Sequence, residues 1–347
     1  MKRLLVAGVA VMLAFWGSAA SPLGGLAVAV SPDGKKLMSA GDNRTLYTID
    51  AATMEVTARH WLGDGILALS FTSDGSRLVA ESTDEALLLI DANSGAVIKK
   101  EDKAGRMSTA LTADLVAGLN PHYNGHIVRL FAMSDLTPKT SISFVKGDKV
   151  AAMGLSPDGK RLAVWLDPVS DDTEPVNRTV PADKKGLEAD EFKQKNDGKT
   201  SRVLLFNTAD GSKIADYKTF YSPSSSGATI FFQGENVLIV TYSNLNLKVD
   251  AKGECTLFKL EGSFNYGLGA SADQQVVMGG GLAAGVYVKM ARMEQVKFQV
   301  GDRLPGWPEY FKSFAVDASG IGYGATSGYR IIRVRPDGTF DKSFPVF

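Results

Sequence analysis

The sequence contains few side chains suited to metal or haem chemistry. Its three histidines are His60, His122 and His126, and neutral imidazole is a common ligand of zinc, copper and iron. His122 and His126 are four residues apart in NPHYNGHIV, but Asn124-Gly125 between them favours a turn, which does not align the two rings as a helix would. No third ligand can be nominated. The sequence predicts no metal site, with a two-histidine turn site as the alternative.

The single cysteine, Cys255, adds little chemistry. One cysteine can form no intramolecular disulfide and cannot supply the paired thiols that attach a c-type haem. Cys255 begins the apolar stretch CTLFKL, and no nearby histidine could activate its thiol. The glycine-rich segment MGGGLAAGVYV at 278–288 lacks the Lys-Ser/Thr ending of a phosphate-binding loop. We therefore predict no catalytic residue and no cofactor.

The aspartates recur mostly in turns, where backbone geometry accounts for them. SPDGKKL at 31–37, TSDGSRLVA at 72–80 and SPDGKRLAV at 156–164 are near-copies of one turn between two short apolar runs. Glycine accepts positive φ, aspartate bonds its own backbone, and proline sets φ before the turn. The pattern predicts an antiparallel hairpin that recurs along the chain.

The spacing of these hairpins indicates a repeat architecture. Asp33 and Asp74 lie 41 positions apart, close to the repeat of about 40 to 45 residues that encodes four strands of a propeller blade. A second hairpin follows each first one, as in LLLIDANSGAVI at 87–98. The seven predicted units are centred on Asp33, Asp74, Asp114, Asp158, Gly234, Asp273 and Asp317.

This repeat predicts an all-β fold, a seven-bladed β-propeller of four-stranded antiparallel blades over 24–347. The one irregular interval contains a polar insertion at about 167–200 in the fourth blade. Six or eight blades, a large β-sandwich or two separate β domains are the alternatives. Within the insertion, KKGLEADEFKQK could form one or two helical turns, and Asp167, Asp171 and Asp172 are conceivable calcium ligands. A lid, a docking arm and a solvated spacer all remain open for it.

The first twenty residues have the pattern of a cleavable signal peptide. Lys2 and Arg3 precede an apolar run from Leu4 to Trp16, and the small residues Gly17-Ser18-Ala19-Ala20 follow. An uncleaved anchor is the alternative. We expect a bacterial periplasmic or secreted protein, monomeric and without membrane insertion after removal of residues 1–20.

The charge balance argues against one class of partner. Lysine plus arginine and aspartate plus glutamate number 38 each. A protein that grips nucleic acid through its phosphates needs a basic surface. We therefore expect no nucleic-acid partner.

Four motifs carry a family resemblance: SPDGKKL, SPDGKRLAV, LYTIDAATMEV at 46–56 and LLLIDANSGAV at 87–97. Through these motifs the chain resembles a family of bacterial periplasmic propellers. This is the YVTN and quinoprotein amine dehydrogenase-like superfamily, which is related to WD-repeat proteins. The resemblance covers nearly all of the chain after the signal peptide, and its motifs encode blade turns. It implies a propeller fold, with redox enzymes, lactonases, assembly factors and protein-binding scaffolds among its members.

The long, varied loops are expected on the ring face opposite the repeated Asp-Gly turns, here called the long-loop face. They include NPHYNGH, the insertion, FYSPSSSGA, YSNLNLKVDAKGE, EGSFNYG and GDRLPGWPEYFKS. Aromatic and arginine side chains on loops are typical of interaction surfaces, although some of the rings could instead seal the channel. The predicted binding residues are Trp61, Arg106, His122, Tyr123, His126, Tyr221, Phe264, Tyr266, Arg303, Trp307 and Tyr310.

These features favour an exported, non-enzymatic scaffold that binds a protein partner in the cell envelope through the long-loop face. The alternative is a quinoprotein-like or lactonase-like enzyme, or enzyme subunit, acting on a small molecule at the channel mouth. Sensing of a small ligand or glycan by the same face lies between them. The scarcity of histidine and the single cysteine weigh against redox catalysis.

Overall fold

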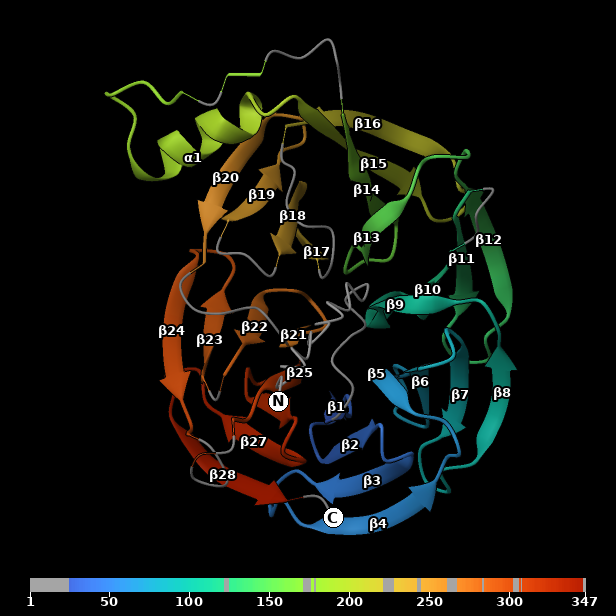
Figure 1. Cartoon of the computed structure of the whole chain (residues 1–347). Coiled ribbons are helices and arrows are strands. Elements are labelled where there is room, and N and C mark those ends of the chain that lie inside the picture. The colour runs from blue at the N-terminus through green and yellow to red at the C-terminus, as the bar shows by residue number, and fades with distance from the viewer. Residues whose placement is uncertain are drawn as a thin grey trace, which may run out of the picture.

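The computed structural model forms a ring of seven sheets (Figure 1), as the repeat predicts. It describes residues 25–121, 125–170, 176–177, 179–220, 228–241, 245–260, 267–282, 284–301, 306 and 308–345. The predicted signal peptide, residues 1–20, lies outside these ranges. In the described residues, no helix is long and apolar enough to cross a membrane.

Each blade consists of four strands that follow one another in the chain. The strands of blades 1 to 4 are β1 (Leu26–Val30), β2 (Lys36–Gly41), β3 (Thr45–Asp50), β4 (Val56–Trp61), β5 (Ile66–Phe71), β6 (Arg77–Ser82), β7 (Leu87–Asp91), β8 (Val97–Glu101), β9 (Gly105–Ala110), β10 (Leu115–Asn120), β11 (Ile127–Ala132), β12 (Pro138–Ser143), β13 (Val150–Leu155), β14 (Arg161–Ser170), β15 (Lys199–Asn207) and β16 (Lys213–Thr219).

Blades 5 to 7 repeat the arrangement, and the described residues also include two short helices, in blades 3 and 4. The remaining strands are β17 (Ala228–Gln233), β18 (Asn236–Thr241), β19 (Leu245–Val249), β20 (Cys255–Lys259), β21 (Gly267–Ala270), β22 (Val276–Gly280), β23 (Ala284–Lys289), β24 (Glu294–Gln299), β25 (Phe311–Val316), β26 (Gly322–Thr326), β27 (Arg330–Val334) and β28 (Phe340–Pro345). The helices are the 3₁₀-helix η1 (Leu111–Ala113) and the α-helix α1 (Gly186–Lys195).

The first strand of each blade lies nearest the ring axis and the fourth lies at the periphery (Figure 1). Because neighbouring strands are antiparallel, the first-to-second and third-to-fourth connections emerge on one face, here called the turn face. The remaining connections emerge on the long-loop face. One loop assignment from the sequence is wrong in part: Asp250–Glu254 of YSNLNLKVDAKGE joins β19 to β20 and so lies on the turn face.

All seven predicted repeat centres occupy the same place in their blades, the connection between the first and second strands. In blade 1 the Ser31 hydroxyl donates to Asp33 Oδ1 at 2.6 Å and accepts the Lys36 N–H at 2.9 Å. Thr72 with Asp74, Ser156 with Asp158 and Ser271 with Asp273 repeat the motif. The repeated sequence is therefore a hydrogen-bonded turn, as its residue types predict. The weaker copy at Asp114 follows η1, and Asp114 adopts φ 52°.

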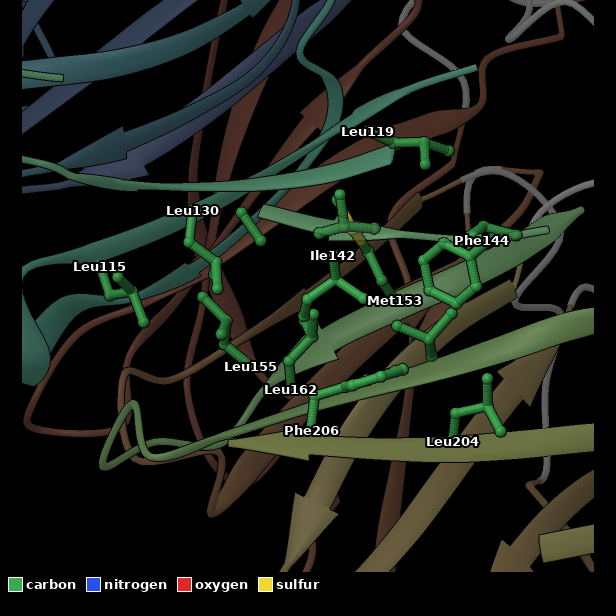
Figure 2. Packing of buried hydrophobic residues seen from close by; sticks show 14 of the residues in the cluster. Leu115, Leu119, Leu130, Ile142, Phe144, Met153, Leu155, Leu162, Leu204 and Phe206 are labelled. Carbon is green, nitrogen blue, oxygen red and sulfur yellow. The ribbon is translucent and has the colours of Figure 1, made fainter. Parts of the chain in front are cut away.

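The hydrophobic core lies between blades. Each of the seven clusters of buried residues in the described chain spans two neighbouring blades. Figure 2 shows the cluster between blades 3 and 4, in which Ile142 and Phe144 face Met153 and Leu162. The rings of Phe144 and Phe206 meet edge to face, with centroids 5.8 Å apart, a favoured aromatic geometry.

The ring closes by packing, because blades 1 and 7 share no strand. Val28 of β1 donates its backbone N–H to Ser313 Oγ at 2.9 Å. At the outer part of this seam, Arg333 Nη1 donates to the Ala51 carbonyl at 2.8 Å. A cluster containing Leu26, Val28 and Tyr323 fills the space between the two blades. Closure therefore depends on side chains at the seam.

Gln274 joins three blades at once. It occupies the turn position that glycine takes at Gly34, and it keeps a positive φ of 56°. Its side-chain amide donates to the Leu155 carbonyl at 2.9 Å in blade 4 and accepts the Phe232 N–H at 2.7 Å in blade 5. Both contacts are buried, so they offset the conformational cost of about 1 kcal/mol for a left-handed non-glycine residue.

We expect Gln274→Gly to destabilise the protein even though it relieves the positive φ. The variant leaves the buried Leu155 carbonyl and Phe232 N–H without their partner, at a cost of roughly 1–3 kcal/mol each before relaxation. The free energy of unfolding from urea denaturation should fall by about 1–3 kcal/mol. Arg44→Gly is the matched control because Arg44 is exposed at φ 58°, and equal stability of the two variants would contradict this role of Gln274.

The turn aspartates should make the stability of the fold fall in acid. Hydrogen bonds from the Thr72 and Ser76 hydroxyls and the Ser76 N–H lower the pKa of Asp74 from 3.8 to about 2. Similar hydrogen bonds lower the pKa of Asp33, Asp50, Asp91, Asp135, Asp158, Asp210, Asp250 and Asp337. A carboxylate with a lowered folded-state pKa stabilises the fold above its unfolded pKa, and this stabilisation disappears as pH falls through the folded value.

We therefore expect the urea midpoint of unfolding to fall between about pH 4 and pH 2, the window set by the ordinary and folded pKa of Asp74. Asp74→Asn should make this fall shallower, since the amide does not titrate. Urea denaturation at several pH values across this window measures both effects. An identical pH profile for variant and wild type would contradict the assignment.

Candidate functional site

Only part of the predicted binding set can be placed. His122, Tyr123, Tyr221, Phe264, Tyr266, Arg303 and Trp307 lie outside the described residues. The described members are Trp61, Arg106, His126 and Tyr310. Arg106 and His126 meet around one residue of blade 4, whereas Trp61 ends the peripheral strand β4 and Tyr310 precedes β25 in blade 7.

Arg106 has a strained backbone held by a carboxylate. It is the second residue of β9, and its φ of 51° lies in the left-handed region that favours glycine. Glu81 of β6, in the neighbouring blade, accepts the Arg106 N–H on Oε1 at 2.7 Å and the Met107 N–H on Oε2 at 2.9 Å. Burial raises the pKa of Glu81, against the effect of these two hydrogen bonds. Backbone strain maintained in this way is common at functional sites.

His126 and Arg106 share Val150 as a partner. His126 Nδ1 accepts the Val150 N–H at 2.9 Å, and Arg106 Nη1 donates to the Val150 carbonyl at 3.2 Å. Val150 begins β13, the innermost strand of blade 4, at the long-loop face. Burial lowers the pKa of His126, and the positive charge of Arg106 lowers it further. Glu81, Arg106, His126 and Val150 form what we call the channel-mouth cluster.

Of the three ionisable residues in the channel-mouth cluster, Arg106 and His126 were predicted from the sequence and Glu81 was not. The available signal was a charged residue directly after the apolar run LVA of β6. Nothing in that sequence shows that its carboxylate reaches the backbone of the next blade. The pairing depends on blade packing, which brings β6 and β9 together.

A buried ion pair, also missed by the sequence, holds the segment before β25. Arg330 Nη2 lies 2.7 Å from Glu309 Oε2, and both side chains are buried. Arg330 Nη2 also donates to the Gly301 carbonyl at 2.6 Å. Tyr310, which follows Glu309 in the chain, donates its N–H to Ser327 Oγ at 2.9 Å. Arg330 therefore fixes both ends of the connection on which Arg303 and Trp307 were predicted.

The structure offers no convergent metal-ligand set in the part of the chain that it describes. Within those residues, no three His, Cys, Asp or Glu side chains are grouped so that they could hold a metal ion. Of the conceivable calcium ligands, Asp167 is described in β14, whereas Asp171 and Asp172 lie outside the described ranges.

Large exposed apolar side chains in the connections are confined to one face, as far as the described residues show. Val145, Val176 and Leu282 lie in connections of the long-loop face and expose 70%, 67% and 53% of their surface. Trp61, at the end of β4 where the chain enters that face, is 71% exposed. The other large exposed apolar residues lie within strands: Leu67, Val97, Ile98, Ile214 and Phe340.

The described part of the insertion packs against blade 5. Helix α1 lies beside β20, outside the ring (Figure 1). Asp190 Oδ2 is 3.1 Å from Lys259 Nζ on β20, and Leu187 packs against the cluster between blades 4 and 5. Lys195 lies over the Phe220 ring, 4.9 Å from its centroid. The insertion connects β14 to β15. These two strands pair with each other as far as Ser170 and Lys199, where the insertion begins and ends.

The fold defines the protein as a seven-bladed β-propeller with a channel-mouth polar cluster on its long-loop face. Neither family models nor curated proteins match the sequence. Among solved structures, the chain is similar to hydrazine synthase of Kuenenia stuttgartiensis, with a TM-score of 0.62 and 14% sequence identity over 93% of this chain and 99% of that chain. In all, 1712 solved chains match. A fold this widespread supports the propeller and leaves the function to be argued from the site.

Cys255 reports on the docking of α1. Burial raises the pKa of its thiol to about 11, and charges on Glu191 and Lys195 of α1 act on it. At pH 8 only about one thiol in a thousand is then the reactive thiolate. Since Cys255 is the only cysteine, modification by Ellman's reagent follows this position alone.

We expect slow modification of Cys255 in the native protein and a rate several-fold higher in Asp190→Lys. The substitution replaces the attraction between Asp190 and Lys259 by repulsion, which loosens α1 from β20. Glu188→Lys is the control because it makes the same charge change at an exposed position on α1. Equal rates in the two variants would show that α1 does not shield the thiol.

Proposed function

We propose that the protein is an exported, non-enzymatic propeller that binds a protein partner in the cell envelope through its long-loop face. The proposal rests on the large exposed apolar side chains in the connections of that face, Val145, Val176 and Leu282. Single exposed apolar residues are common on protein surfaces. Here, within the described chain, the large exposed apolar side chains in connections all lie on one face, and this restriction favours a binding surface.

The positions of these side chains favour a broad contact. Val145 lies between blades 3 and 4, Val176 lies in the insertion and Leu282 lies in blade 6. Leu282 also pairs by a β-bridge with Tyr310, a predicted binding residue whose backbone is held by Ser327. Apolar groups set around a ring suit a partner that covers much of the face, with rigid strands keeping the contact points in place.

Export to the periplasm, or secretion, is part of the proposal. It is supported by the charged start, apolar run and small residues of the first twenty positions. A chain with one cysteine has no disulfide to stabilise it in an oxidising compartment. The seven inter-blade clusters supply the packing on which its stability would depend.

The test compares apolar side chains on and off the face. We expect Val145→Ser combined with Leu282→Ser to reduce recovery of a co-purifying envelope protein at least tenfold, because apolar area at the contact is lost. Affinity purification from envelope extract, with quantitative mass spectrometry, measures the recovery.

The matched control combines Ile98→Ser with Ile214→Ser. These residues are 50% and 54% exposed on the peripheral strands β8 and β16. The control should recover the partner as well as the wild type does. Equal recovery by both double variants, or a partner lost only from the control, would reject the long-loop face as the binding surface.

A further inference from the structure

An aspartate beside the channel-mouth cluster has a buried oxygen without a hydrogen-bond partner. Asp167 Oδ1 is buried and bonds to no other described residue. The backbone N–H of Asp167 donates to the Lys149 carbonyl at 2.8 Å, which places it next to Val150. Its negative charge acts on His126. An unpaired buried acceptor costs about 1–3 kcal/mol, so the structure retains an unfavourable feature at this position.

The same place presents hydrogen-bond donors. His126 Nδ1 accepts the Val150 N–H, so in the neutral imidazole the proton is on Nε2, which is left as a donor. Arg106 is exposed, and in the described residues the one acceptor of its guanidinium is the Val150 carbonyl. Guanidinium carries five N–H donors in a planar fork that matches a carboxylate.

We propose that the channel mouth binds a small α-amino acid. Its carboxylate would be held by the Arg106 guanidinium and His126 Nε2–H, and its ammonium by the carboxylate of Asp167, a residue that is partly exposed although its Oδ1 is buried. The site is new relative to the protein-binding surface and does not depend on it. It places a small-molecule site where the innermost strands of blades 3 and 4 begin.

The charge distribution favours a zwitterion over a simple anion. The negative charge of Asp167 acts on His126. A ligand bearing only negative charge would therefore be repelled by Asp167, because it has no positive group to pair with that carboxylate. A ligand bearing only an ammonium group would meet the Arg106 guanidinium. A molecule carrying both groups pairs each with an opposite charge, and charge-assisted hydrogen bonds are the stronger ones.

Glu81 acts here as a positioning residue. Its two carboxylate oxygens hold the N–H groups of Arg106 and Met107. These bonds hold Arg106 at its left-handed φ, and so they set the course of the backbone at the start of β9, at the channel mouth. The hydrogen bonds to Glu81 offset the cost of this backbone conformation in the free protein. Arg106 is therefore held in place before a ligand binds, as a preorganised site requires.

Three histidines make the test direct. In protein labelled with ¹³C-histidine, the His126 resonance is assigned from its loss in His126→Gln. L-alanine is the probe, with propionate and ethylamine as its two halves. We expect millimolar L-alanine to shift the His126 resonance saturably and leave that of His60 unchanged. Each half-molecule should bind at least tenfold more weakly.

Two variants separate the contacts. Arg106→Asn keeps a residue type that tolerates positive φ, and Asp167→Asn keeps the shape of the side chain. Each should weaken L-alanine binding at least tenfold, and Asp167→Asn should also remove the preference for L-alanine over propionate. Lys139→Asn and Glu188→Gln, exposed and outside the cluster, should bind as the wild type does.

No saturable shift of His126 with L-alanine would overturn the proposal. Equal binding of L-alanine and propionate would also overturn it, because Asp167 would then contribute nothing. Unchanged L-alanine binding in the Asp167→Asn variant would have the same consequence. The protein-binding proposal is unaffected by any of these outcomes, since its variants lie elsewhere on the face.

Discussion

The structure depends on one constraint: a four-stranded blade cannot bury both faces of its own sheet. Every cluster of buried residues in the described chain therefore fills the space between two blades. Stability in such an architecture is shared between neighbours, and each blade needs one on both sides. The ring is the arrangement that provides this for all seven, and it leaves the fourth strands as the only outer edges.

At the seams between blades, polar side chains form hydrogen bonds with backbone groups of a neighbouring blade. Because blades 1 and 7 share no strand, Ser313 and Arg333 bond backbone groups across that seam. Gln274 takes a glycine position in a turn of blade 6 and uses its amide to join that blade to blades 4 and 5. Glu81 does the same for blades 2 and 3 through the backbone of Arg106. In each case a polar group satisfies a backbone group that the neighbouring sheet cannot reach.

The two faces of the ring divide structure from proposed function. On the turn face, hydroxyl and carboxylate groups bond the nearby backbone, so their chemistry is already used. On the long-loop face, the connections carry large exposed apolar side chains. The channel mouth combines a strained arginine with a histidine Nε2–H and an aspartate oxygen that have no hydrogen-bond partner among the described residues. The proposals concern this face because its groups have interactions still to make.

The sequence alone determined the fold, because the repeated turn depends on local chemistry. Ser31, Asp33 and Gly34 bond or bend their own backbone, and the spacing from Asp33 to Asp74 counts one blade. Only the tertiary structure decided the site. Glu81 reaches Arg106 from another blade, and Val150 joins Arg106 to His126 across 44 and 24 positions. Such contacts arise from how blades pack, which no local residue pattern records. The same reason explains why the sequence predicted Arg106 and His126 as loop residues but showed nothing of their common partner.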